Sequence, residues 1–405
     1  MASGYFARLR EWLRDLTEGK QVVKLWLIQI VFADTNLPKP LAKFILSKTK
    51  ELQTLMTLAE FRNQHPELFL LDASDIPSLE HFLRSLKVLT ASETVHAIAR
   101  AGEGNMNCTL RVTTNLRTFI VKQSRPWVEK YPQFAAPWDR ALREREFYEM
   151  VATVPDLAGA LPRLLVCERE ARLLVFEDLG MGGDYSGTYR GELFQTGEID
   201  ALAKFLSRLH GMFEQVEDRP SLPNREMRTL NHAHIFEIPL NPVNGLDLDR
   251  LQPGLQRAAE GLKEDTDFCS EVRRLGCEVY LADGPCLLHG DFFPGSFVRT
   301  LSGPRVIDPE FCFFGRPEWD AGVFQAHLWL GGQSAALREK FLQAYRSPVG
   351  FDTALMMQLA GVEIMRRLIG YAQLPLSSSL AERKSLLDLS RELVLQPSIG
   401  LLAKC

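Results

Sequence analysis

Hydrophobic and polar residues alternate along the chain between His96 and Gln123, which is the pattern of half-buried β-strands. Two clusters of turn-forming residues divide this alternation into three segments, HAIARAG, CTLRVT and TFIVKQ. A helix is predicted from about Asp139 to Val151, and a further strand at Arg172 to Gly180, RLLVFEDLG. This part of the chain therefore predicts a small antiparallel sheet with one or two helices.

The spacing of apolar residues becomes helical beyond this strand. From Ile199 to Val216 apolar side chains recur three and four positions apart, so they form one amphipathic face. Leu355 to Leu374, LMMQLAGVEIMRRLIGYAQL, predicts a strongly apolar helix. The whole pattern indicates an α+β fold in which the sheet precedes a mostly helical region.

Composition adds few constraints. A chain of 405 residues makes one large or two medium domains, and 46% hydrophobic with 24% charged residues is ordinary for a soluble globular protein. The net charge of −4 gives no indication of nucleic acid as a partner. No apolar run is long enough for stable membrane insertion. The seven cysteines are scattered without C-x-x-C spacing, which favours a cytoplasmic protein without disulfides or structural zinc.

Residues 1–65 form an N-terminal extension whose role the sequence does not reveal. The apolar stretch from Val22 to Ala33 predicts helices that pack on the body of the protein. A peripheral membrane helix, a partner-binding helix and an over-extended start codon are the alternatives. A secretory signal fits poorly, because acidic Glu11, Asp15 and Glu18 precede the apolar stretch.

Two short apolar runs later in the chain each lead into carboxylates. Cys286–Leu288 is followed by His289–Gly290–Asp291, and Val306–Ile307 is followed by Asp308–Pro309–Glu310. A carboxylate just past a buried strand is held rigidly and can still face a cleft, which suits an acid, a base or a metal ligand. The alternative is a pair of unrelated acidic turns.

The spacing within these segments makes the prediction more specific. Asp291 and Ser296 are five residues apart, like the base and the metal-binding residue in the catalytic loop of protein kinases. Asp308 precedes a proline, which favours an extended conformation, and residues i and i+2 of an extended segment face the same way. Asp308 and Glu310 are therefore predicted to hold one cation, with Mg²⁺ on phosphates the best match to oxygen ligands.

A glycine-rich turn between the first two strands predicts a phosphate-binding hairpin. Its candidate residues are Gly102, Gly104, Asn105 and Asn107. Lys122 ends the third strand, where a kinase places the lysine that holds the α- and β-phosphates. A lysine in the apolar segment FIVK needs an anionic partner. Glu144 in the following helix is the first choice, and Glu146 is the alternative.

The segment HGDFFPGS resembles the catalytic loop of the aminoglycoside phosphotransferase and choline kinase group. VIDPEF, together with Ser296, resembles methylthioribose kinases more narrowly, and the likeness extends over roughly residues 85 to 395. It implies a two-lobed protein kinase-like fold that binds ATP and Mg²⁺. The N-lobe is then expected at residues 66–179 and the helical C-lobe at residues 180–405.

The resemblance also assigns roles to individual residues. It makes Asp291 the catalytic base, and Glu177 and Leu179 part of the hinge that binds the adenine edge. His289 and Asp320 are expected to support the catalytic loop. Arg366 and Arg367, in MRRLIGYA, resemble a pair that contacts the sugar substrate. The alternative for these arginines is a salt bridge to the acidic loops.

The acceptor is expected to be a small hydroxylated molecule, because no activation segment ending in Ala-Pro-Glu lies between Glu310 and Asp320. The resemblance favours 5-methylthioribose or a related sugar. The segment VEKYPQFAAPWDRA departs from the methylthioribose kinase pattern and leaves aminoglycoside, choline or another small alcohol open. An alternative of another class is a nucleotide-binding pseudokinase scaffold. A homodimer is left open.

Overall fold

The computed structural model describes residues 58–102, 104, 106–214 and 216–404. The chain divides into two compact units, Met1–Phe61 and Arg62–Cys405. Helix α4 (Leu58–Gln64) contains the point of division. The helices predicted within residues 1–57 lie outside the described residues. The boundaries predicted after residues 65 and 179 stay predictions.

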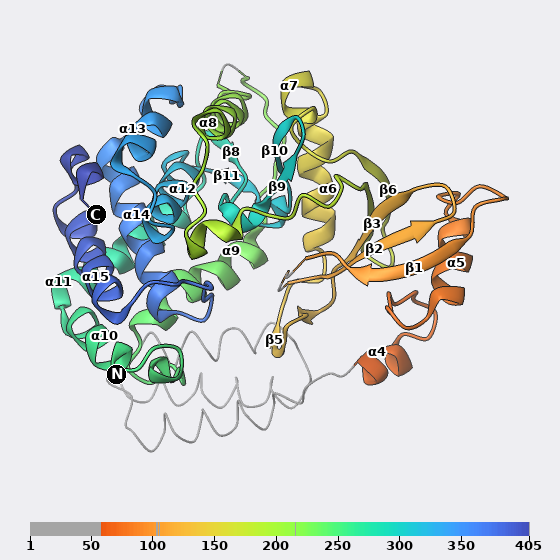
Figure 1. The fold of residues 1–405 in the computed structure, drawn as a ribbon, viewed down its shortest axis with the longest axis horizontal. Coiled ribbons are helices and arrows are strands. Elements are labelled where there is room, and N and C mark those ends of the chain that lie inside the picture. Colours follow the sequence, from red (N-terminus) through yellow and green to blue (C-terminus); the bar gives the residue numbers. More distant parts are fainter. Residues whose placement is uncertain (1–57, 103, 105, 215, 405) are drawn as a thin grey trace, which may run out of the picture. The chain divides into compact units, whose positions relative to one another are not determined.

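A five-stranded antiparallel sheet forms the first part of the second unit (Figure 1). Its strand order is β1-β2-β3-β7-β6. The strands are β1 (Val95–Arg100), β2 (Cys108–Thr114), β3 (Thr118–Gln123), β6 (Leu164–Glu168) and β7 (Leu173–Glu177). Buried and half-buried residues alternate along β2, as the sequence pattern predicts. This period of two gives the sheet two distinct faces.

Each face of the sheet packs on a helix. Helix α5 (Ile76–Ser85) buries Leu79 and Leu83 in one cluster with Val175 of β7. Helix α6 (Arg140–Val151) buries Phe147 and its neighbours in another cluster, which contains the adjacent β7 residue Phe176. Because neighbouring strand residues point to opposite faces, α5 and α6 cover opposite sides of the sheet. The short helix α7 (Pro155–Ala158) follows α6.

A small hairpin links the sheet region to the helical region. It consists of β4 (Trp127–Val128) and β5 (Tyr131–Ala135). The ring of Phe134 lies with its centroid 5.2 Å from that of Tyr371 and 5.5 Å from that of His234, both edge-to-face. This aromatic contact joins a segment from before β7 to residues far along the chain.

The helical region surrounds two buried helices. α12 (Glu318–Leu330) is buried at every position, and α14 (Thr353–Ile369) at almost every position, which explains why their sequences are apolar on all sides. The helices around them are α8 (Thr196–His210), α9 (Arg225–His232), α10 (Leu255–Glu264), α11 (Thr266–Arg274), α13 (Ala335–Ala344) and α15 (Leu380–Leu395). The helical region also contains two π-helical segments, Ala233–Glu237 and Leu275–Tyr280, and several 3₁₀ turns.

The predicted catalytic segments lie on two small antiparallel pairs. β8 (Cys286–Leu288) pairs with β11 (Phe313–Gly315), and β9 (Phe297–Thr300) pairs with β10 (Gly303–Val306). The two predicted apolar runs are β8 and the end of β10. The α+β arrangement of a sheet region followed by a helical region is thus the one that the sequence predicts.

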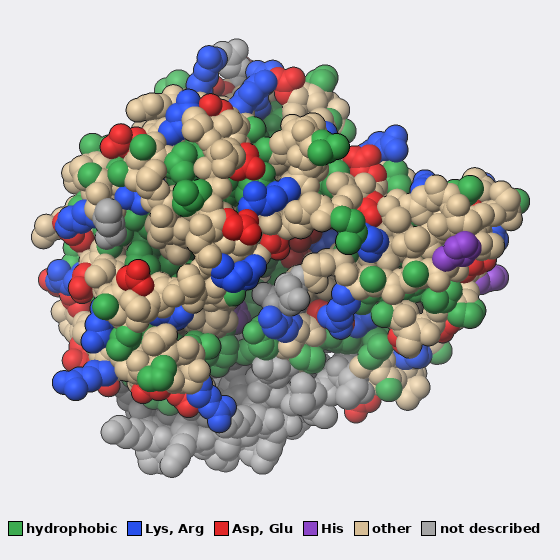
Figure 2. Space-filling view, in the orientation of Figure 1, with side chains coloured by type: hydrophobic (Ala, Val, Ile, Leu, Met, Phe, Trp, Pro, Cys, Tyr) green, Lys and Arg blue, Asp and Glu red, His purple; other side chains and the backbone are tan. Residues whose placement is uncertain are grey.

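The surface agrees with the balanced composition. On the face shown in Figure 2, acidic and basic side chains of the described residues are interspersed. None of the described helices combines the length and hydrophobicity that crossing a bilayer would require.

We expect Gly290→Ala to destabilise the protein. Gly290 follows β8 with φ of +88°, and a Cβ added there would lie 2.2 Å from the Phe311 carbonyl oxygen. The strained backbone alone costs about 1–3 kcal/mol. Urea denaturation should show the loss. Gly261→Ala in α10 is the matched control, since its Cβ would meet open space, and it should raise stability by about 0.5–1 kcal/mol. Equal stability of the two variants would contradict this expectation.

Candidate active site

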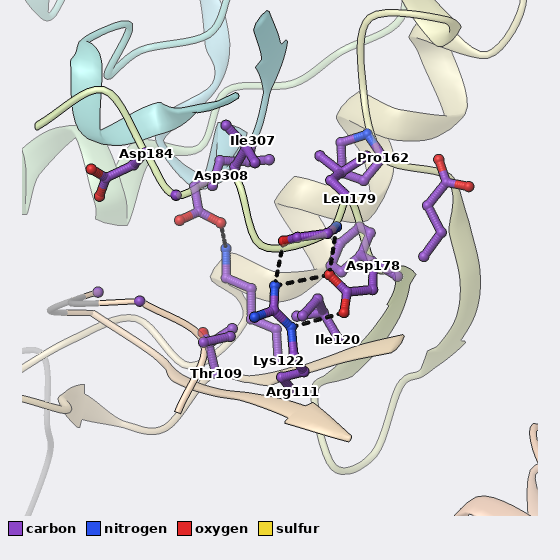
Figure 3. A pocket seen from close by; sticks show the side chains of 18 of the residues that line it. Thr109, Arg111, Ile120, Lys122, Pro162, Asp178, Leu179, Asp184, Ile307 and Asp308 are labelled. Atoms are coloured by element: carbon purple, nitrogen blue, oxygen red, sulfur yellow. Dashed lines mark hydrogen bonds and ion pairs between the residues drawn. The ribbon is translucent and has the colours of Figure 1, made fainter. Parts of the chain in front are cut away.

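Lys122 lies between two carboxylates. Its Nζ is 2.7 Å from Glu144 Oε2 of α6. It is also 2.7 Å from Asp308 Oδ1 (Figure 3). Burial by itself would lower the pKa of Lys122, but Asp308 and Glu144 raise it above its ordinary value, so the ammonium keeps its charge. Of the two acids proposed as partners, Glu144 makes the contact, whereas Glu146 pairs with Arg143 at 2.6 Å.

A pocket of about 290 Å³ opens beside Lys122 (Figure 3). Its walls come from the glycine-rich turn, the sheet, the segment after β7 and the loop around β9. They include the predicted residues Gly102, Gly104, Lys122, Glu144, Glu177, Leu179 and Asp308. The predicted Asn105 lies outside the described residues. An apolar wall containing Ile120 and Phe176 beside a lysine and a glycine-rich turn suits a flat base attached to phosphates.

An ion pair that the sequence analysis missed lines the same pocket. Arg111 of β2 donates from Nη2 to Asp178 Oδ1 at 2.9 Å and to the Gly180 carbonyl at 2.6 Å (Figure 3). It ties the predicted hinge to the sheet. Arg111 occupies a half-buried position of β2, and the alternating pattern of a strand does not reveal the partner of such a residue. The acidic Asp178 beside Glu177 was the only feature of the sequence that indicated a need for a basic partner.

Asn107 does not line the pocket. Its side-chain amide donates to Glu310 Oε2 at 2.9 Å, and its oxygen accepts from Arg140 Nε at 2.9 Å. Arg140 Nε also lies 3.2 Å from Glu310 Oε2. Asn107, Arg140 and Glu310 therefore form a buried polar cluster that joins the glycine-rich turn to α6 and to the segment after β10.

The predicted extended conformation of Asp308 is wrong. Asp308 has φ of 62° and ψ of 50°, and Pro309–Phe311 then makes a 3₁₀ turn. The proline does disfavour the right-handed helical region, but aspartate tolerates the left-handed region better than most residues. As a result Asp308 and Glu310 diverge. The Asp308 side chain is 45% exposed in the pocket, whereas that of Glu310 is 5% exposed beside Arg140.

The donor set at the pocket fits Mg²⁺ through Asp308. Its carboxylate offers a hard, accessible oxygen, and Mg²⁺ takes one or two carboxylates with phosphates and waters completing its shell. Across the described ranges, no group of three His, Cys, Asp or Glu side chains forms a site that holds a metal by itself. The predicted ligand Ser296 is buried and donates from Oγ to the backbone carbonyl of Asp291 at 2.9 Å.

Asp320 and His289 shape the loop that carries Asp291. The Asp320 carboxylate of α12 accepts from the backbone N–H groups of His289 at 2.7 Å and Gly290 at 2.9 Å. His289 Nδ1 accepts from the Asp291 N–H, so its proton is assigned to Nε2, which donates to the Ile307 carbonyl at 2.9 Å. Burial lowers the pKa of His289 and keeps the ring neutral. One histidine thus connects the Asp291 loop to the residue before Asp308.

The side chain of Asp291 faces two arginines of α14. Its Oδ1 lies 3.5 Å from Arg366 Nη2 and 3.3 Å from Arg367 Nη2. Burial raises the pKa of Asp291, and the two guanidinium groups oppose that shift. Among the described residues, the polar contacts of its carboxylate all pass through Oδ1, so Oδ2 is left to meet another group.

Glu363, which the sequence analysis missed, holds the same two arginines from the other side. Its Oε1 is 2.6 Å from Arg367 Nε, and its Oε2 is 2.8 Å from Arg366 Nε. The spacing Glu363-x-x-Arg366-Arg367 places the acid at i−3 and i−4, where helical residues meet, so the signal was in the sequence.

Comparison with known proteins agrees with this geometry. The chain is 25% identical over 240 residues to a methylthioribose kinase of Exiguobacterium sibiricum, covering 56% of this chain and 59% of the relative. It is 26% identical over 282 residues to methylthioribose kinase 1 of Oryza sativa subsp. japonica, covering 63% and 62%. The match thus spans about three fifths of the length of these curated relatives.

A solved structure and a family model extend the comparison. A choline kinase from Cryptosporidium parvum Iowa II has the same fold, with a TM-score of 0.50 at 13% identity over 81% of this chain and 98% of that chain. The model of the phosphotransferase enzyme family (APH) matches residues 97–359, which is more than half of the chain. The match includes the glycine-rich turn, Lys122 and the Asp291 and Asp308 segments. The chain therefore belongs to the phosphotransferase enzyme family.

Proposed function

We propose that the protein is an ATP-dependent kinase that transfers the γ-phosphoryl group to a hydroxyl of a small molecule, most simply 5-methylthioribose or a related sugar. The observation that carries the proposal is the convergence of two charged groups and one loop on one pocket. Lys122 and Asp308 pair at its wall, and the loop that follows Asp291 contributes Gly295 to the same wall. We infer from this arrangement that Lys122 holds the phosphates, that Asp308 holds the metal, and that Asp291, on the loop that reaches the pocket wall, is the base.

Asp291 is the base in this proposal. Arg366 and Arg367 hold Oδ1, so Oδ2 can accept a hydrogen bond from the acceptor hydroxyl and orient it. The acceptor oxygen forms a bond to the γ-phosphorus as the bond from that phosphorus to the ADP oxygen breaks. The proton of the hydroxyl passes to Asp291. Such transfer depends mainly on placement and charge stabilisation.

Lys122 and the Gly102–Gly104 turn hold the phosphates of ATP, and the segment from Glu177 to Leu179 contacts its adenine ring. Asp308 would bind Mg²⁺, which when present neutralises negative charge on the phosphates. A metal role for Glu310 requires its carboxylate to leave Arg140, and Ser296 is proposed only to shape the loop near the metal.

The proposed acceptor rests on two observations. Guanidinium groups beside Asp291 offer several fixed donors to hydroxyls of a sugar. The curated relatives are methylthioribose kinases, although the match spans only part of their length. A pseudokinase scaffold is the poorer interpretation, because the Lys122–Glu144–Asp308 set is assembled. Release of ADP from ATP, measured against a panel of sugars, amino alcohols and aminoglycosides, tests the function. No acceptor-dependent release from any compound would refute it.

We expect Asp291→Asn to lower turnover by about 10²–10⁴-fold, because the amide cannot accept the hydroxyl proton. ATP affinity should change less than threefold, since other groups hold the nucleotide. Acceptor-dependent ADP release and calorimetric ATP binding give the two values. A variant that retains a tenth of wild-type turnover would remove Asp291 from the role of base.

Glu144→Gln should weaken ATP use about ten- to hundredfold, because Lys122 loses a charged hydrogen-bond partner worth roughly 1.5–3 kcal/mol. Glu146→Gln is the matched control on the same helix and should change kcat/KM for ATP less than twofold, since its partner is Arg143. Similar losses in the two variants would show that the position of Lys122 does not depend on Glu144.

Asp308→Asn should raise the Mg²⁺ concentration for half-maximal activity at least about tenfold, because a carboxylate ligand is lost. Glu310→Gln should mainly lower the melting temperature, since Arg140 would keep a buried charge without its carboxylate. Magnesium titrations and thermal melts of both variants provide the comparison. If Glu310→Gln shifts the magnesium requirement as much as Asp308→Asn without loss of stability, Glu310 is a metal ligand.

A further inference from the structure

Four charged side chains form one buried group beside the proposed acceptor position. Asp291, Glu363, Arg366 and Arg367 are called the quartet below. Each arginine contacts both carboxylates, at 2.6 and 2.8 Å for Glu363 and at 3.3 and 3.5 Å for Asp291. The arginines are 5% exposed and Glu363 is fully buried. Two positive and two negative charges therefore cancel within a few ångströms.

The titratable groups around the quartet are neutral, so they leave its charge unchanged. His327 Nε2 lies 3.1 Å from Glu363 Oε1, and burial lowers the pKa of His327 to about 4. Tyr189, whose hydroxyl is 2.6 Å from His327 Nδ1, has a pKa well above its ordinary value because it is buried. Burial also lowers the pKa of His234 to about 4, with a smaller contribution from Arg366 in the same direction.

The other contacts that the two arginines make are with uncharged groups. Arg366 Nη1 lies 3.3 Å from Asn231 Oδ1, and Arg367 Nη1 lies 3.4 Å from the Ala372 carbonyl oxygen. Arg367 further stacks over the Phe293 ring, with Cζ 4.6 Å from its centroid. Glu363 is thus the group that balances the second arginine, since Asp291 alone would balance only one.

We propose that Glu363 is a positioning residue that makes the quartet neutral and thereby selects an uncharged polyhydroxyl acceptor over anionic and cationic ones. This inference rests on the proposed function and assigns its specificity. A charged acceptor placed against the quartet loses hydration without gaining a free opposite charge, which is unfavourable in a buried site. Hydroxyl groups can still bind guanidinium N–H donors, so the site favours sugars while it disfavours acids and ammonium compounds.

The test compares three acceptors with a five-carbon chain: 5-methylthioribose, D-ribonate and 2-amino-2-deoxy-D-ribose. In Glu363→Gln the quartet gains a net positive charge. The kcat/KM ratio of D-ribonate to 5-methylthioribose should then rise at least about tenfold, and KM for ATP should stay within about twofold. In Arg367→Gln the quartet gains a net negative charge instead. The kcat/KM ratio of 2-amino-2-deoxy-D-ribose to 5-methylthioribose should then rise. The double variant restores neutrality and should return both ratios to within about threefold of wild type.

Glu271→Gln is the matched control. Glu271 contacts α14 through Gln358 at 2.9 Å and is not part of the quartet, so neither ratio should move. A uniform loss of activity on all three acceptors in Glu363→Gln, with unchanged ratios, would overturn the proposal and leave Glu363 a purely structural residue. If Glu363→Gln does not fold, the Arg367→Gln variant tests the proposal instead. Only charge balance predicts that its kcat/KM ratio shifts toward the cationic sugar, so an unchanged ratio would overturn the proposal. Wild-type protein that uses other compounds of the panel but not 5-methylthioribose would overturn this inference, whereas wild-type protein that uses no compound at all would refute the proposed function.

Discussion

The placement of an ammonium group inside the protein is the constraint on which the site depends. An unpaired buried charge is strongly unfavourable, so the fold must bring carboxylates to Lys122. Glu144 comes from α6. Asp308 comes from the segment after β10 and lies 186 residues after Lys122 in the chain. Satisfying one lysine therefore fixes the sheet, a helix and a distant loop in one arrangement, and the pocket is the space that remains between them.

Much of this arrangement could be predicted from the sequence, because its signals are local or repeat a known order. Period-two alternation marks the strands around Lys122, and the apolar runs before Asp291 and Asp308 mark the ends of β8 and β10. The pairing of Glu144 with Lys122 could also be predicted, because a buried lysine needs an acidic partner and the next helix offers one. In each case a single strong requirement, burial or charge pairing, determines the local structure.

Other features depend on tertiary competition that a sequence does not display. The residue before a proline has two allowed regions, and the packing around Asp308 selects the left-handed one. Asn107 was predicted at the phosphates because its turn is glycine-rich, yet the buried Arg140 and Glu310 engage it. Glu363 was overlooked because an acidic residue in an apolar helix was not matched to the two arginines that follow it.

The β4–β5 hairpin gives the sheet region a contact with the helical region that differs in kind from the buried ion pairs. Phe134 packs on Tyr371 and His234 through apolar ring edges, whereas Lys122 meets Asp308 and Arg140 meets Glu310 through opposite charges. Salt weakens contacts between charges and leaves packing between rings largely intact. A change in ionic strength that loosened the charged contacts would therefore still leave the two regions joined at the hairpin.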